Sequence, residues 1–147
     1  MLLVEAENLC GDLPSLKTLQ LRFVRFKNQN FLQQLLNASP NLEDLNAYGN
    51  SKHDENSAPV GVKSLSLAKL VRAEMGARDV PYNVVNNVEY LCIEDAQKAN
   101  LTSIPVFPNL IHIKLWFYDF FHGWDGILQL LQHCPKLQTL FIIRKVC

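Results

Sequence analysis

Apolar residues recur along this chain in a repeated order, and two pairs of segments are close copies of each other. The string LPSLKTLQL at residues 13–21 matches FPNLIHIKL at residues 107–115. A second pair consists of ASPNLEDL at residues 38–45 and HCPKLQTL at residues 133–140. Weaker copies lie between them, VKSLSL at residues 62–67 and VEYLCI at residues 88–93. Each copy leads into apolar residues at alternate positions, which predicts a strand with one buried face.

The copies align on one central apolar residue in each unit. These positions are Leu19, Leu45, Leu65, Leu91, Ile113 and Leu140. They are 20 to 27 residues apart, and leucine-rich repeats run for about 20 to 29 residues with one strand in each unit. One such strand cannot bury its apolar face alone, so successive units stack their strands in parallel with a return segment behind each. The sequence therefore predicts an α/β fold, a single leucine-rich-repeat domain over residues 1–147. About six units would form a solenoid with a curved parallel sheet on the concave side and helices or loops on the convex side.

Two return segments are predicted to be helical, because their apolar residues fall at helical spacing and a proline follows each of them. In residues 28–38, ahead of Pro40, these residues are Phe31, Leu32, Leu35 and Leu36. Ahead of Pro135 they are Ile127, Leu128, Leu130 and Leu131. The polar segment 48–59 predicts a loop, whereas residues 68–85 are compatible with a short helix through Leu70, Val71 and Met75.

Composition and charge disfavour several classes of protein. Fourteen basic and fourteen acidic side chains cancel, so the basic excess typical of nucleic-acid binders is absent. The sequence shows no signal peptide and no apolar stretch of the roughly 18 residues that a membrane span requires. The four cysteines do not have the spacing of a zinc site. We therefore expect an intracellular protein of the nucleus or cytoplasm with reduced thiols, which needs no cofactor and contacts neither nucleic acid nor membrane.

The repeat segments resemble those of plant F-box/leucine-rich-repeat proteins, of the type with a C-terminal FBD region. The resemblance covers about residues 13–145 and is most specific in the strings FPNLIHIKL (107–115), LLQHCP (130–135) and KLQTLFI (136–142). It implies the substrate-recruiting part of a ubiquitin ligase. A Skp-type adaptor is implied only for a longer form that contains an F-box, because no F-box precedes Leu13 and the chain stops at Cys147. We therefore expect a fragment of such a protein, and a truncated structural or regulatory fragment without a ligase role is the alternative.

In a solenoid of this kind, the strand residues between the leucines line the concave surface, where partners bind. Trp, Tyr and Arg are frequent at interface hot spots, and the segment 116–124 is rich in aromatic residues. We therefore predict a protein-binding surface on the concave face and the aromatic segment. Its predicted residues are Gln20, Arg22, Asp44, Asn46, Tyr48, Tyr90, His112, Lys114, Trp116, Phe141, Tyr118 and Trp124. The alternative for the aromatic rings is that they fill space beneath a long loop.

No residue set predicts catalysis or metal binding. Asp119, His122 and Asp125 lie close in sequence but match no single helical or strand face, so a hydrolase site would require that the fold bring them together. The pair His133 and Cys134 offers a thiol without a positioned base. The sequence therefore predicts a binding protein that is not an enzyme.

Overall fold

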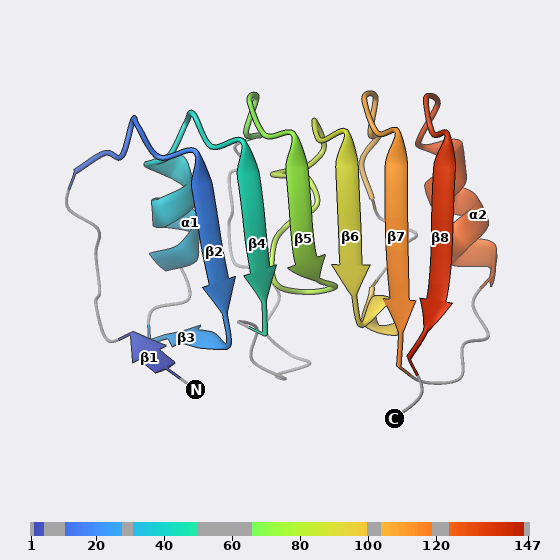
Figure 1. Cartoon of the computed structure of the whole chain (residues 1–147), viewed down its shortest axis with the longest axis horizontal. Helices are drawn as coiled ribbons and strands as arrows, with labels where there is room; N and C mark the ends of the chain where they lie inside the picture. The colour runs from blue at the N-terminus through green and yellow to red at the C-terminus, as the bar shows by residue number, and fades with distance from the viewer. Residues whose placement is uncertain are drawn as a thin grey trace.

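The computed structural model describes residues 2–4, 11–27, 31–49, 66–99, 104–118 and 124–145. Within these residues, the main feature is a six-stranded parallel sheet whose neighbouring strands follow one another along the chain (Figure 1). Its strands are β2 (Thr18–Arg22), β4 (Asp44–Tyr48), β5 (Arg72–Gly76), β6 (Tyr90–Glu94), β7 (His112–Phe117) and β8 (Thr139–Arg144). A separate parallel pair joins β1 (Leu2–Val4) to β3 (Val24–Phe26). The return segments contain α1 (Phe31–Asn37), α2 (Trp124–Gln132) and the 3-10 helix η1 (Ala96–Lys98).

The strands are held in one register by a backbone contact that recurs at every step across the sheet. The carbonyl of Lys17, just before β2, accepts the N–H groups of Glu43 and Asp44 at 2.8 and 3.0 Å. The same two-donor contact is made by the carbonyls of Glu43, Val71, Glu89 and Ile111. The register brings one core-facing residue from each strand into a single row, Leu19, Leu45, Ala73, Leu91, Ile113 and Leu140. The same backbone contact therefore recurs between each pair of neighbouring strands.

The third strand is β5, and the prediction of a strand centred on Leu65 was wrong. Both edges of β5 are hydrogen-bonded, to β4 and to β6, so no other segment can lie between these two strands. Leu65 itself lies outside the described residues. Leu67 instead takes part in the turn that precedes the strand, where its carbonyl accepts the N–H of Leu70 at 3.2 Å.

The pattern over residues 68–85 was ambiguous, and the short helix that Leu70, Val71 and Met75 could have made does not form. Residues 72–76 are extended, and their side chains alternate between the two faces of the sheet. Ala73 and Met75 are completely buried, whereas Arg72 is exposed and Glu74 is half-buried. Pairing on both edges satisfies the backbone of this segment more completely than one isolated helical turn would.

The core lies between the sheet and the return segments. Leu45, Leu91, Ile113 and Leu115 are fully buried on the strand side. On the helical side, α1 contributes Leu36, and α2 contributes Ile127 and Leu130. Burying each such side chain contributes about 1.5–3 kcal/mol. Leu128, which was assigned to the apolar face of its helix, is instead 55% exposed.

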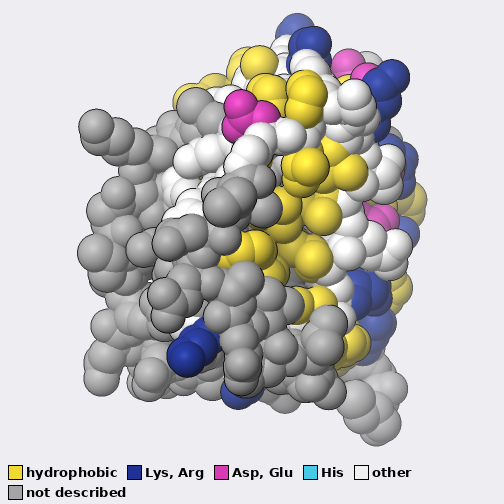
Figure 2. All heavy atoms as spheres, turned by 90° about the vertical axis from the view of Figure 1, so that its left-hand side faces the viewer, with side chains coloured by type: hydrophobic (Ala, Val, Ile, Leu, Met, Phe, Trp, Pro, Cys, Tyr) yellow, Lys and Arg dark blue, Asp and Glu magenta, His cyan; other side chains and the backbone are white. Residues whose placement is uncertain are grey.

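Both ends of the sheet leave apolar side chains accessible. At the β2 end, hydrophobic side chains gather in the middle of the surface (Figure 2). Leu13, which precedes β2, and Phe23, which follows it, are 39% and 51% exposed. At the β8 end, Leu140 and Ile142 are 37% and 38% exposed, although they continue the rows of the fully buried core residues of β7. None of the helices within the described ranges is long and apolar enough to cross a membrane.

Candidate functional site

The face of the sheet opposite the core carries three rows of side chains, and we call it the open face. Side chains alternate along a strand, so the residues immediately before and after each core position point away from the core. The first row contains Thr18, Asp44, Arg72, Tyr90, His112 and Thr139. The second contains Gln20, Asn46, Glu74, Cys92, Lys114 and Phe141, and the third contains Arg22, Tyr48, Gly76, Glu94, Trp116 and Ile143. Except for Gly76 and Cys92, these residues are half-buried or exposed.

On β2, β4 and β5, polar groups of the open face are joined to one another. The amide of Asn46 accepts a hydrogen bond from Arg22 Nε at 3.3 Å and donates one to Glu74 Oε2 at 3.0 Å. The guanidinium of Arg22 also lies 5.8 Å from the ring centre of Tyr48. One neutral amide therefore links a cation to an anion across three strands.

From β5 to β8, rings and cations replace this polar chain. The guanidinium of Arg72 lies 4.1 Å from the ring centre of Tyr90, which is stacked on His112 with 4.8 Å between ring centres. The next ring is Phe141, 5.1 Å from His112. The ammonium of Lys114 lies 5.6 Å from the ring of Trp116 and 5.7 Å from that of Phe141. These distances are within the range of favourable cation–π attraction.

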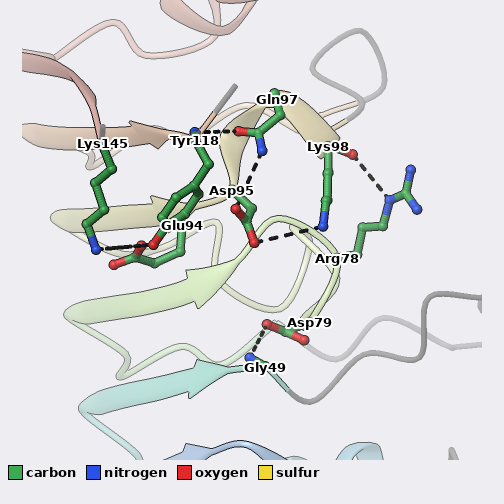
Figure 3. Close-up of polar contacts among 9 residues, drawn as sticks. All are labelled: Gly49, Arg78, Asp79, Glu94, Asp95, Gln97, Lys98, Tyr118 and Lys145. Carbon is green, nitrogen blue, oxygen red and sulfur yellow. Dashed lines mark hydrogen bonds and ion pairs between the residues drawn. The ribbon is translucent and has the colours of Figure 1, made fainter. Parts of the chain in front are cut away.

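A polar cluster forms where β6, β7 and β8 end (Figure 3). The hydroxyl of Tyr118 donates to Glu94 Oε2 at 2.9 Å and accepts from Lys145 Nζ at 3.1 Å. Lys145 also forms an ion pair with Glu94 at 3.7 Å and lies 4.7 Å from the ring centre of Trp116. The side chain of Gln97 accepts the backbone N–H of Tyr118 at 3.3 Å. The cluster fixes the residues that follow β7 and β8 against the end of β6.

The third row has no side chain at Gly76, at the end of β5. A Cβ at this position would collide with the carboxylate of Asp79 and would come within 3.4 Å of Tyr48. The absence of a side chain allows Asp79 to accept the backbone N–H of Gly49 at 3.0 Å (Figure 3). This contact ties the turn after β5 to the end of β4, and no sequence pattern indicated it.

Two tyrosines in this region, Tyr48 and Tyr118, are held in their neutral forms. Burial raises the pKa of Tyr48 above its ordinary value, and a hydrogen bond with Tyr118 and the charge of Asp95 raise it further. Burial and the hydrogen bond to Glu94 also raise the pKa of Tyr118. Both phenols therefore remain protonated near neutral pH and act as hydrogen-bond donors.

Burial also keeps two thiols protonated. It raises the pKa of Cys92 to about 11, with a further contribution from the charge of Glu94, and it raises the pKa of Cys134 to about 11. The thiol of Cys134 is buried and donates to the carbonyl of Leu130 at 3.2 Å, while Nδ1 of His133 lies 2.7 Å from the carbonyl of Gln129. Since the thiolate is the reactive form, this geometry does not equip Cys134 as a nucleophile.

The structure places most of the predicted binding residues together. Ten of them lie on the open face, namely Gln20, Arg22, Asp44, Asn46, Tyr48, Tyr90, His112, Lys114, Trp116 and Phe141. Tyr118 lies beside them in the polar cluster, whereas the side chain of Trp124 is outside the described part of the chain. Arg72 and Glu74 were missed because the third strand was misplaced. The spacing of Leu67, Leu70, Ala73 and Met75 matches that of Leu13, Leu16, Leu19 and Leu21 and could have identified them.

The aromatic segment divides between surface and core. Trp116 faces outward from β7, but Phe117 is buried in the core with 3% exposure. Residues 119–123, which include Asp119 and His122, lie outside the described residues, and Asp125 lies in the first turn of α2. Within the described residues, no group of three or more His, Cys, Asp or Glu side chains is placed where it could hold a metal ion.

Comparison with known families adds one match. Residues 15–40 match the family model described as Leucine Rich Repeat; this stretch contains β2, β3 and α1. No curated protein and no solved structure matches the chain. The chain thus combines a mixed α/β structure and a six-stranded parallel sheet with a leucine-rich-repeat match. Leucine-rich repeats typically form binding surfaces for other proteins and are not themselves catalytic.

Proposed function

We propose that the chain is a leucine-rich-repeat solenoid of six units in a single domain, and that its open face is the concave surface on which a protein partner docks. Three observations support the proposal: the strands run in chain order, the same backbone contact recurs between units, and residues 15–40 match the repeat family. Stacked repeats of this kind use the strand face as an extended binding surface.

The observation that carries the proposal is the set of large side chains on the open face. Phe141 is 44% exposed, and Trp116, Tyr90 and His112 are half-buried among neighbouring strands. Contiguous exposed apolar surface is uncommon on a soluble protein unless something binds there. Aromatic rings held by neighbouring side chains are also the usual anchors of protein interfaces.

A finer assignment rests on the resemblance to plant F-box proteins. In that family, the repeats recruit the substrate of a ubiquitin ligase in the nucleus or cytoplasm, and we propose the same role for the open face. A Skp-type adaptor would be a partner only of a longer form that contains an F-box. The family match at residues 15–40 supports the repeat but does not reach this finer role.

Replacing Trp116 with alanine is expected to weaken partner capture by about tenfold or more, which is an ordinary loss for an aromatic anchor. The fold should persist because Trp116 points away from the core. The measurement is affinity capture from lysate with the purified domain as bait, quantified by mass spectrometry, beside circular dichroism of the same variant.

Leu128→Ala is the matched control, because Leu128 is 55% exposed on α2 and lies outside the open face. Its captured proteins should equal those of the unmodified domain. Loss of the dichroism signal in Trp116→Ala would show that Trp116 supports the fold instead, and equal capture by both variants would exclude the open face as the binding surface.

A further inference from the structure

Two cations on the open face contact aromatic rings and form no ion pair with a carboxylate in the part of the chain that the structure describes. Arg72 lies over Tyr90, and Lys114 lies near Trp116 and Phe141. Within the described residues, the ion pairs join other side chains, Lys98 to Asp95 at 4.0 Å and Lys145 to Glu94 at 3.7 Å. The charges of Arg72 and Lys114 are therefore available to a bound molecule.

Within the described residues, no acidic group of the open face forms an ion pair with Arg72 or Lys114. Glu94 accepts from Tyr118 and pairs with Lys145, and Glu74 accepts from Asn46. Asp44 is next to Arg72 in the register but forms no ion pair with it, and the Arg72 guanidinium lies against Tyr90 on the other side. The register neighbours of Lys114 are Cys92 and Phe141, neither of which carries a negative charge.

We propose that the part of the open face formed by β5 to β8 binds an acidic polypeptide segment that also carries apolar or aromatic side chains. This inference rests on the proposed function and specifies the chemistry of its partner. Carboxylates of the partner would pair with Lys114 and Arg72, and its apolar groups would lie on Trp116 and Phe141. An ammonium or guanidinium beside an aromatic ring already has its aliphatic stem and one side desolvated, which strengthens its pairing with a carboxylate.

The spacing of the two cations sets a geometric requirement on the partner. Arg72 and Lys114 belong to strands two positions apart in the sheet, a separation of roughly 10 Å. An extended segment rises about 3.3 Å per residue. Lys114 also lies one row further along the strands than Arg72. Acidic residues four positions apart in an extended segment point to the same side and are roughly 13 Å apart, so a segment that crosses the strands obliquely would reach both cations.

The test measures binding of a fluorescein-labelled random copolymer of glutamate and tyrosine to the purified domain by fluorescence anisotropy. Poly-lysine and poly-uridine RNA serve as comparison probes. The expected result is binding to the acidic copolymer that weakens as salt rises from about 50 mM to about 300 mM. Lys114→Glu should weaken it by about tenfold or more, and Lys114→Arg should retain it.

Lys136→Glu is the control of equal charge change, because Lys136 is an exposed residue in the turn before β8. It should alter the affinity by no more than about twofold. Melting temperatures of all variants establish that each one is folded. Equal weakening by Lys114→Glu and Lys136→Glu would overturn the proposal, since only net charge would then matter.

Two other results would also overturn it. Tighter binding of poly-uridine than of the copolymer, lost in Lys114→Glu, would assign the surface to nucleic acid. Absence of copolymer binding by the folded, unmodified domain would reject an acidic partner. If Trp116→Ala still abolished partner capture in that case, the open face would remain a protein-binding surface and only the acidic chemistry would be wrong.

Discussion

Replacing Ala73 with aspartate is expected to lower the free energy of unfolding by more than about 4 kcal/mol, enough to prevent folding of many domains. Ala73 is fully buried in β5, between Leu45 of β4 and Leu91 of β6 in the register. A carboxylate at this position would lose its water and find only apolar neighbours, which is among the most destabilising changes a core can receive. Urea unfolding followed by circular dichroism measures the effect.

The adjacent residue provides the matched control. Arg72→Asp introduces an aspartate one position earlier, where the side chain is exposed on the open face. This variant should keep the free energy of unfolding within about 1 kcal/mol of the unmodified protein, as surface substitutions usually do. If Ala73→Asp folded normally, or if Arg72→Asp were equally harmful, the assignment of the third strand to residues 72–76 would be incorrect.

Replacing Phe107 with alanine is expected to lower the free energy of unfolding by about 3–5 kcal/mol. Phe107 is fully buried, and its backbone N–H donates to the carbonyl of His133 at 2.9 Å. Its ring therefore fills the core where the segment before β7 meets the end of α2, and its removal leaves a cavity that a rigid parallel sheet cannot close. The midpoint of urea unfolding should fall while the slope stays unchanged.

Val106→Ala removes apolar atoms from the neighbouring position, which is 52% exposed. Its expected effect is within about 0.5 kcal/mol. Comparable losses in the two variants would indicate that the ring of Phe107 does not occupy the core.

The strands that the sequence predicted correctly are those with leucine or isoleucine at the core positions. Leu19, Leu45, Leu91, Ile113 and Leu140 all lie in strands of the sheet, because their alternation leaves only one face that can be buried. The third unit has Ala73 and Met75 at these positions, and the pattern LSL at residues 65–67 offered a more typical alternation nearby. Of the two segments, residues 72–76 form the strand because they pair with both neighbouring strands. A local sequence pattern does not contain this information.

The residues of the candidate site were predictable wherever the strand that carries them was placed correctly. Once a strand is placed, alternation assigns residues such as Gln20 and Lys114 to the open face without further information. The contacts among them were not predictable, because they depend on register. Tyr118 reaches Glu94 over 24 residues of sequence and Lys145 over 27, and Gly76 acquires its role only from the approach of Asp79.

The open face has two parts with different chemistry. On the first strands, Arg22, Asn46 and Glu74 satisfy one another's hydrogen bonds. On the later strands, the cations contact rings and leave their charge available. Polar groups that are already paired gain little from a partner, whereas unpaired cations beside rings gain both charge pairing and desolvated apolar contact. The later strands are therefore where we expect most of the binding energy.

Site-specific photo-crosslinking tests the central claim, that the open face binds a protein, most directly. A benzophenone amino acid would replace Phe141, which is exposed on the open face, or Leu128, which is exposed on α2. We predict that irradiation in lysate links the Phe141 variant to the same proteins that Trp116→Ala fails to capture, and that the Leu128 variant links to none of them. Crosslinks from Leu128 to those proteins, with none from Phe141, would contradict the account.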